Sequence, residues 1–238
     1  MEDKSKTLIL FDVGAVQVSL DFESFYRELS KLSDLSEDKF REIYGKSDLE
    51  LRSAKGMTPE EYFELLRGLT SIRKEVPESV LRGAYITKIR GEIQEAIEIK
   101  ERLEEAGYNT GVLSNCDKFT LDFISSEYPR VFRTRKPENR IVSCEVGFAK
   151  PDIGIYRAVP SGNFDQVIFI DDSEKYIQIG IDNFDNWKGI WFTPYIDGGE
   201  AQRGGDDKGN TPNLTDRIKI ANSVGELEKS LESFGLEF

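Results

Sequence analysis

The sequence contains no histidine among its 238 residues. This absence excludes Ser-His-Asp and Cys-His nucleophile systems, phosphohistidine chemistry and every metal site that uses histidine ligands. Cysteine is scarce as well: the two cysteines, Cys116 and Cys144, form neither a CxxC pair nor a metal-ligand cluster. We therefore expect two free, buried thiols in a reducing compartment rather than a disulfide bond.

The sequence also lacks long apolar runs and an excess of positive charge. No stretch approaches the ~20 apolar residues that cross a bilayer, and the first apolar run is too short for a signal peptide. The 32 Lys and Arg against 44 Asp and Glu give a net charge of −12, which argues against a nucleic-acid binder because such a protein needs a basic face. We expect a cytoplasmic protein whose partners include neither nucleic acid nor a membrane.

The hydrophobic residues, 38% of the chain, are enough for a folded core with one smaller inserted module. Residues 8–13 form a short continuous apolar run before Gly14, typical of a strand buried on both faces of a parallel sheet. Residues 20–90 have helical periodicity instead. Phe22, Phe25 and Tyr26 mark one apolar helix face there, which we expect to pack inside the module.

Beyond this helical region the pattern alternates between helix and strand. We predict helices over 93–107, 118–126, 152–159, 174–183 and 225–234, and strands over 109–114, 140–143, 167–171 and 189–192. The glycine-rich residues 195–213 are expected to form a loop. This order predicts an α/β fold, a doubly wound and mainly parallel sheet with an inserted all-helical cap. We assign residues 1–16 and 91–238 to the α/β core and residues 17–90 to the cap.

Polar side chains stand at the carboxyl ends of the predicted strands, where ligands bind in such sheets. Asp12 ends the first apolar run, and Ser114-Asn115 ends the strand over 109–114. A buried strand has no use for a carboxylate at its tip, so Asp12 is a candidate nucleophile or metal ligand. Lys150, in the segment GFAKPDIGIY, adds a fixed cation before Pro151.

The strongest strand, VIFID, ends in the pair Asp171-Asp172. Adjacent carboxylates near a third one require a cation, because like charges in one crevice are costly. Oxygen ligands without histidine or cysteine select Mg²⁺. A dication together with Lys150 would form a positive site that suits a phosphate group.

These candidate residues lie in four segments, which follow one another along the chain in this order: LILFDVGAV, LSNCD, GFAKPDIGIY and VIFIDDSEKYIQIG. Their order, with a helical insertion between the first two, resembles the haloacid dehalogenase-like hydrolase superfamily over nearly the whole chain. The first and third segments look most like the small-sugar-phosphate phosphatases of that superfamily, which carry a helical cap. The resemblance therefore implies a phosphatase acting on a small phosphorylated metabolite.

The resemblance also implies roles for the residues at the strand ends. Asp12 would be the nucleophile that forms an aspartyl-phosphate. Ser114 would hydrogen-bond the transferred phosphoryl group, and Lys150 would neutralise the group and orient Asp12. Asn115, beside Ser114 at the strand end, offers an amide for substrate binding. The Mg²⁺ ligands would be the following four: the carboxylates of Asp12 and Asp172, the supporting Asp171, and the backbone carbonyl of Gly14.

Two positions depart from the family pattern. Most phosphatases of the superfamily carry a second aspartate, an acid and base, at the position of Gly14, and an asparagine at the position of Tyr176. These departures keep a second hypothesis open, a degenerate member that binds Mg²⁺ and a phospho-ligand without turnover. A metal-independent dehalogenase is a third, since dehalogenases also lack the second aspartate.

Simpler structural roles compete with the functional ones. Asp171 and Asp172 could also cap the next helix, and Asn115 could order its loop. Burial is the main expectation for Cys116. A solvated loop is the main expectation for a group of basic residues: Arg130, Arg133, Arg135, Lys136 and Arg140.

Overall fold

A six-stranded sheet lies at the centre of the structure, a computed structural model that describes residues 3–193 and 216–238. The strand order is β5-β4-β1-β6-β7-β8, and every neighbouring pair is parallel. The strands are β1 (Thr7–Phe11), β4 (Asn109–Ser114), β5 (Arg140–Val142), β6 (Gln166–Asp171), β7 (Trp187–Phe192) and β8 (Ile218–Ala221). The predicted fold class is confirmed. Sequence reasoning missed β8, and the loop predicted over 195–213 lies outside the described residues.

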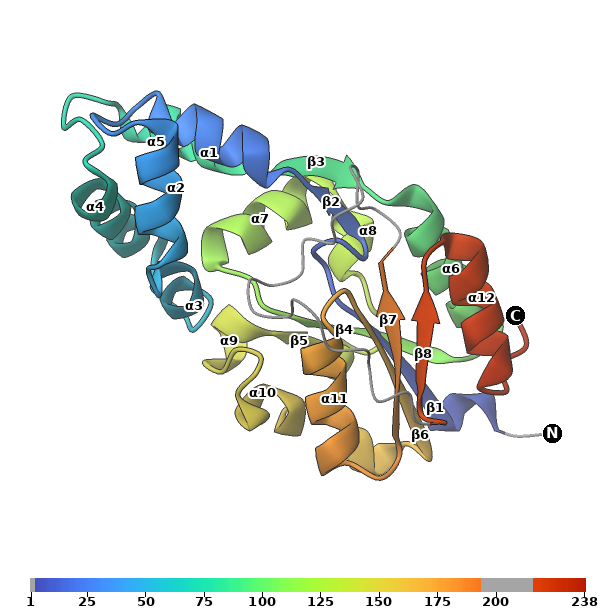
Figure 1. Ribbon diagram of the computed structural model, residues 1–238. Helices are drawn as coiled ribbons and strands as arrows, with labels where there is room; N and C mark the ends of the chain where they lie inside the picture. Colours follow the sequence, from blue (N-terminus) through green and yellow to red (C-terminus); the bar gives the residue numbers. More distant parts are fainter. Residues whose placement is uncertain (1–2, 194–215) are drawn as a thin grey trace.

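Helices cover both faces of the sheet (Figure 1). Alternate residues of β1 serve different faces, as a strand with a two-residue period requires. Ile9 and Phe11 pack in one cluster with α6 (Gln94–Glu105) and α12 (Val224–Ser233). Leu8 and Leu10 pack in another cluster with α10 (Ile153–Arg157) and α11 (Glu174–Asn183). This arrangement explains the unbroken apolar run of β1, since a strand of a doubly wound sheet is buried on both sides.

The remaining helices of the α/β part are short or lie at its edge. They are η1 (Lys4–Lys6), α7 (Lys118–Glu127), α8 (Pro129–Phe132), η2 (Pro137–Asn139), α9 (Ser143–Val146) and η3 (Ser161–Asn163). Asp117 begins α7 by accepting a hydrogen bond from the Thr120 N–H, a normal N-terminal cap. Within the described ranges, no helix combines the length and apolarity that a bilayer crossing needs.

Five helices lie together beyond one end of the sheet (Figure 1). These are α1 (Phe22–Ser30), α2 (Glu37–Gly45), α3 (Leu49–Ser53), α4 (Pro59–Thr70) and α5 (Glu78–Ile86), called the helical segment below. They bury a hydrophobic cluster of their own, in which Phe25 is fully buried and Phe22 and Tyr26 pack against it, as predicted. Thr58 and Glu61 form the capping box that starts α4.

The ends of the helical segment differ from the sequence prediction. Residues 17–90 are not helical throughout, because β2 (Val18–Leu20) pairs antiparallel with β3 (Ile89–Glu92). The strands are too short to show a two-residue period in the sequence, and their register shifts at Ser19 and Leu20. The chain thus leaves and re-enters the sheet through a paired two-stranded ribbon.

A close backbone approach at Gly111 yields a stability prediction. A Cβ atom there would lie 2.5 Å from the carbonyl oxygen of Asn139 and 2.9 Å from Leu10 Cδ2, inside the sheet. We expect Gly111→Ala to lower the free energy of unfolding by about 1–3 kcal/mol in urea titrations, because the backbone must shift. Gly68→Ala in α4 is the matched control: no atom lies within 4 Å, and we expect a gain of up to about 1 kcal/mol. Equal stability of Gly111→Ala and the wild type would contradict the prediction.

Candidate active site

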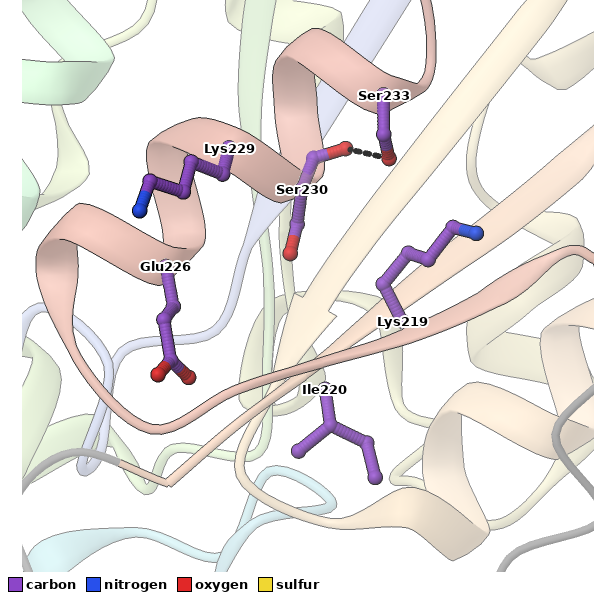
Figure 2. A pocket seen from close by; sticks show the side chains of 6 residues that line it. All are labelled: Lys219, Ile220, Glu226, Lys229, Ser230 and Ser233. Atoms are coloured by element: carbon purple, nitrogen blue, oxygen red, sulfur yellow. Dashed lines mark hydrogen bonds between the residues drawn. The ribbon is translucent and has the colours of Figure 1, made fainter.

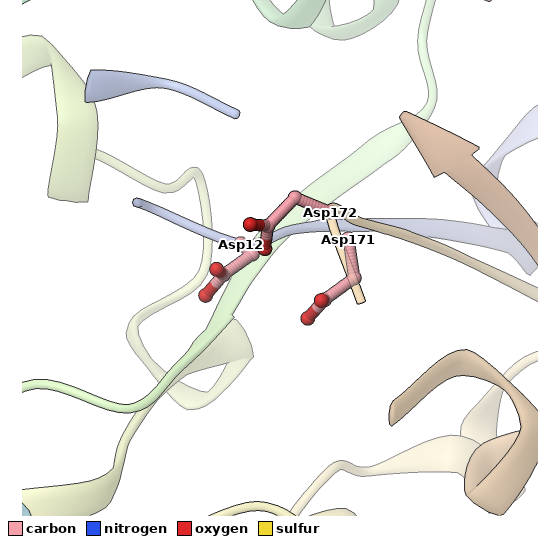
Figure 3. A group of neighbouring side chains, drawn as sticks. All are labelled: Asp12, Asp171 and Asp172. Carbon is pink, nitrogen blue, oxygen red and sulfur yellow. The ribbon is translucent and has the colours of Figure 1, made fainter. Parts of the chain in front are cut away.

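Three aspartates meet at the carboxyl ends of the two central strands (Figure 3). Asp12 follows β1 and its N–H donates to the Ile170 carbonyl at 2.9 Å, which extends the pairing of β1 with β6. Asp171 ends β6, and Asp172 follows it. One carboxylate oxygen from each of the three lies within 4.8 Å of the others. The structure thus brings together three aspartates that the sequence placed at strand ends.

Lys150 places one ammonium group between these carboxylates. Its Nζ lies 2.6 Å from Asp171 Oδ2 and 3.0 Å from Asp12 Oδ1, and the side chain is only 1% exposed. Burial alone would lower the pKa of Lys150, but the charges of Asp12 and Asp171 outweigh it and raise the pKa above the usual range. Apart from this ion pair, the buried Asp12 Oδ1 has no hydrogen-bond partner among the described residues. It retains lone pairs for another partner.

The charges do not balance in this cluster. Burial raises the pKa of Asp171, and the proximity of Asp12 adds to the rise, while Lys150 opposes it. Burial also raises the pKa of Asp172, helped by the charges of Asp171 and Asp12. Three carboxylates facing one ammonium therefore favour the uptake of a further cation. The all-oxygen donor set, in which Asp12 Oδ1 has only the ion pair with Lys150, fits a hard divalent cation.

Asn115 orders the loop that carries Lys150. Its Nδ2 donates to the Lys150 carbonyl at 2.8 Å, and its Oδ1 accepts from the Lys150 N–H at 2.7 Å. Both polar groups of the Asn115 amide therefore bind the Lys150 backbone, which confirms the simpler prediction that Asn115 orders its loop. Ser114 ends β4 and is buried, and its hydroxyl makes no hydrogen bond among the described residues. Phe11 pairs with Val112, so Ser114 stands two residues farther along the strand beside β1.

The two departures from the family pattern both lie next to the cluster. Tyr176, in the first turn of α11, places its ring 5.0 Å from Lys150 Nζ, and its carbonyl accepts from the Tyr156 hydroxyl at 2.9 Å. Gly14 follows Asp12 by two residues and bridges to Val18. A Cβ on Gly14 would lie 3.0 Å from the tip of the Leu20 side chain.

Neither Asp171 nor Asp172 caps helix α11, a role that the sequence had left open. The N-cap residue of α11 is Ser173, and no side chain caps the helix. Asp171 Oδ1 instead accepts from the Ser173 N–H at 2.7 Å, before the helix begins. Both oxygens of Asp171 are thus engaged, one by Ser173 and one by Lys150.

The remaining sequence predictions have mixed outcomes. Cys116 is buried, and burial raises the pKa of its thiol, whereas Cys144 is only half-buried, which corrects the prediction of two buried thiols. Both are free. The solvated loop expected for the basic group holds for the exposed Arg133, Arg135 and Lys136, whereas Arg130 lies in α8 and Arg140 begins β5. Arg130 and Arg133 contact Glu101, and Arg140 contacts Glu145.

Sequence reasoning missed two side chains that hold the backbone of the cluster. Gln17 Nε2 donates to the Asp12 carbonyl at 3.0 Å. Trp191 Nε1, on β7, donates to the Asp172 carbonyl at 2.9 Å. A polar residue between Val16 and Val18 is the one sequence signal that pointed to Gln17.

A separate hollow of about 300 Å³ lies between β8 and α12 (Figure 2). Its lining residues are Lys219, Ile220, Glu226, Lys229, Ser230 and Ser233. None of the predicted site residues lines it. The chemistry of the acidic cluster therefore does not extend into this hollow.

Comparisons with solved structures relate the chain to a superfamily. The sequence matches no family model and no curated protein. Among solved structures, a haloacid dehalogenase-like (HAD) family enzyme from Bacteroides thetaiotaomicron, in complex with magnesium and inorganic phosphate, is 25% identical. It aligns with a TM-score of 0.62 over 74% of this chain and 89% of that chain. The chain belongs to the HAD-like hydrolase superfamily.

Other members of the superfamily share the fold at lower identity. A predicted HAD-like hydrolase from Porphyromonas gingivalis is 21% identical, with a TM-score of 0.61 over 75% of this chain and 87% of that chain. An L-2-haloacid dehalogenase is 16% identical, with a TM-score of 0.62 over 95% of this chain and 99% of that chain. The superfamily supports a hydrolase, and the reaction must be argued from the residues at the site.

The central role of Lys150 yields a prediction about stability and pH. We expect Lys150→Met, measured in urea with a chelator, to lower the free energy of unfolding by about 3–5 kcal/mol at pH 8. Carboxyls whose pKa is raised by folding stabilise the folded state at low pH, and this contribution is lost as the pH rises through the folded pKa. The loss of unfolding free energy in Lys150→Met should therefore be smaller at pH 5, where protonation of the cluster's carboxyls removes their mutual repulsion. Lys55→Met, at an exposed position, is the control. A loss of equal size at both pH values would refute the electrostatic explanation.

Proposed function

We propose that the chain is a Mg²⁺-dependent phosphatase that hydrolyses a small, sugar-phosphate-like metabolite through an aspartyl-phosphate on Asp12. The observation that carries this proposal is the cluster of three carboxylates around the single ammonium of Lys150. A dehalogenase needs the carboxylate nucleophile but no metal, whereas this cluster has an excess of negative charge that a divalent cation would balance. The magnesium and phosphate in the related Bacteroides enzyme support the same reaction.

The residues of the cluster can divide the work as follows. A carboxylate oxygen of Asp12 attacks phosphorus, and the bond from phosphorus to the leaving-group oxygen breaks. Water then attacks phosphorus in the aspartyl-phosphate, which releases phosphate and restores the carboxylate. Lys150 holds the Asp12 oxygen in place and supplies positive charge, and the hydroxyl of Ser114 donates to a phosphoryl oxygen. Asn115 contributes by fixing the Lys150 loop.

The metal would be held by oxygen atoms of this same edge of the sheet. When bound, Mg²⁺ would neutralise negative charge on the phosphoryl group and the carboxylates. Both oxygens of Asp171 are already engaged, so Asp171 supports the site while Asp12 and Asp172 provide direct ligands. The carbonyl of Gly14 is the further proposed ligand.

The helical segment is proposed to act as the cap that selects the leaving group. It leaves the sheet through β2, shortly after Gly14. Tyr85 of α5 donates to Asp117 at 2.9 Å, and Asp117 follows Ser114-Asn115 in the chain. The segment therefore contacts the loop that begins at the proposed phosphate site, and closure of such a segment can exclude water.

A second candidate function is the binding of Mg²⁺ and a phospho-ligand without turnover, as a regulatory or scaffold protein. Two observations favour it: Gly14 supplies no acid or base, and the Tyr176 ring faces Lys150. A metal-independent dehalogenase is the third candidate, because it needs no residue at the Gly14 position.

The first test is phosphate release from a panel of anomeric, acyl and alkyl phosphates. We expect release that requires Mg²⁺, stops with chelator, and falls by at least about 10³-fold in Asp12→Asn, since the nucleophile is lost. Asp34→Asn, at an exposed position in the helical segment, is the control and should keep full activity. Mg²⁺ binding can be followed through Trp191, whose indole contacts Asp172.

The outcomes separate the three candidates. Mg²⁺ binding with no phosphate release from any member of the panel would favour the non-catalytic binder. Halide release from 2-haloacids that survives chelation would favour the dehalogenase. Release that depends on both Asp12 and Mg²⁺ supports the phosphatase.

The absent side chain at Gly14 yields a sharper prediction. Gly14 does not have a positive φ, and a Cβ there meets only the flexible tip of Leu20, so the chain can accept a side chain at this position. We expect Gly14→Asp to raise kcat for alkyl phosphates about 10²-fold or more, because an acid then protonates the leaving oxygen. Acyl phosphates should gain much less. Gly14→Asn, which has the same size without the acid, is the control, and equal rates for the two variants would disprove the role of the missing acid.

A further inference from the structure

Gln17 is fully buried and uses all four of its hydrogen-bonding groups. Its N–H donates to the Val13 carbonyl at 2.9 Å, and its carbonyl accepts from the Ile93 N–H at 2.8 Å. Its side-chain Nε2 donates to the Asp12 carbonyl at 3.0 Å, and its Oε1 accepts from Lys100 Nζ at 3.2 Å. One side chain therefore connects the proposed nucleophile to a second buried polar residue.

Lys100 is an unusual residue for its position. It lies on the buried side of α6, beside Ile99 and Leu103, and is 2% exposed. Its Nζ donates to two neutral oxygens, Gln17 Oε1 and the Val131 carbonyl at 2.8 Å. Burial lowers its pKa to about 8; Glu104 and Glu101 oppose this effect, and Arg133 adds to it. A buried ammonium is costly and an apolar side chain would suit this place, so a specific task explains it better than packing.

The location of Gln17 relates it to the helical segment as well. Gln17 comes immediately before β2, and its partner Ile93 follows β3 directly. These strands are the two connections between the sheet and the helical segment. Gln17 thus links the carbonyl of Asp12 to both connections and to α6.

We propose that Gln17, held in place by Lys100, is a positioning residue for Asp12. The hydrogen bond from Nε2 fixes the peptide plane after Asp12 and thereby the direction of its carboxylate toward Lys150. Lys100 orients the amide of Gln17, because its ammonium can only donate and so keeps the oxygen toward α6 and the NH₂ toward Asp12. The inference rests on the proposed role of Asp12 as nucleophile.

The test compares Gln17→Met, Gln17→Glu and Lys100→Met with the wild type in Mg²⁺-dependent phosphate release. Gln17→Met should lower kcat about tenfold to hundredfold with KM nearly unchanged, since a small misplacement of the nucleophile has such an effect. Gln17→Glu keeps an oxygen for Lys100 but has no N–H for the Asp12 carbonyl. Its kcat should therefore fall by the same factor as that of Gln17→Met. The double variant Gln17→Met, Lys100→Met should be no slower than Gln17→Met alone, because Lys100 acts through Gln17.

A control variant and a second readout separate positioning from stability. Asn186→Ala removes two hydrogen bonds to Ser161 and Phe164 far from this connection, and should lower stability without lowering kcat. Amide hydrogen exchange, compared at equal global stability, should become faster at residues 12–17 in Gln17→Met and stay unchanged there in Asn186→Ala.

The results distinguish this inference from the proposed function. Normal kcat in both Gln17 variants, in an active wild type, would overturn the positioning role and leave the phosphatase intact. Unchanged exchange at residues 12–17 would overturn it as well. A wild type without turnover, combined with faster local exchange in Gln17→Met, would reject the phosphatase and leave Gln17 only as a residue that holds the backbone of Asp12. If Gln17→Met does not fold, kcat and the hydrogen exchange of residues 12–17 are compared in Gln17→Glu and Lys100→Met instead.

Discussion

The ammonium of Lys150, shared between Asp12 and Asp171, is the interaction on which the site depends. A parallel sheet brings the ends of its central strands together, and here each end carries a carboxylate. Burying these groups without a cation would be prohibitive, so Lys150 makes the arrangement possible. One ammonium balances only part of the charge of three carboxylates. The same imbalance that destabilises the metal-free site gives it affinity for a divalent cation, and so links stability to function.

The side chains around the cluster act mostly on its backbone. Asn115 binds the N–H and the carbonyl of Lys150, Gln17 holds the carbonyl of Asp12, and Trp191 holds that of Asp172. Each of these amides or indoles comes from a neighbouring element of the sheet or its loops. A carboxylate at the end of a strand is otherwise free to rotate with its loop. These contacts fix the backbone at each functional residue to the rigid sheet, and so they define the direction in which each side chain points.

The parts of the fold that sequence reasoning found are those with strong local patterns. Short apolar runs identified β1 and β6, the alternation of helix and strand indicated β4, and the convergence of parallel strand ends then placed Asp12 and Asp171 together. The ribbon of β2 and β3 escaped because three or four residues show no period. Lys100 and Gln17 escaped for another reason: 83 residues separate them, and a lysine on a helix is expected to reach solvent. Its actual partner depends on the packing of α6 against the loop after β1, which no local pattern encodes.

Gly14 affects the two halves of the proposed reaction differently. Forming the aspartyl-phosphate requires a proton for the leaving oxygen, and a substrate with an acidic leaving group avoids that requirement. Hydrolysing the aspartyl-phosphate requires a base for water, and this step is the same whatever the substrate was. A good leaving group therefore compensates for Gly14 in the first half only. Under the proposed reaction, the second half must rely on the electrostatics that Lys150 and the carboxylates provide. The charge balance of the cluster, rather than acid–base catalysis, would then determine whether the aspartyl-phosphate is hydrolysed.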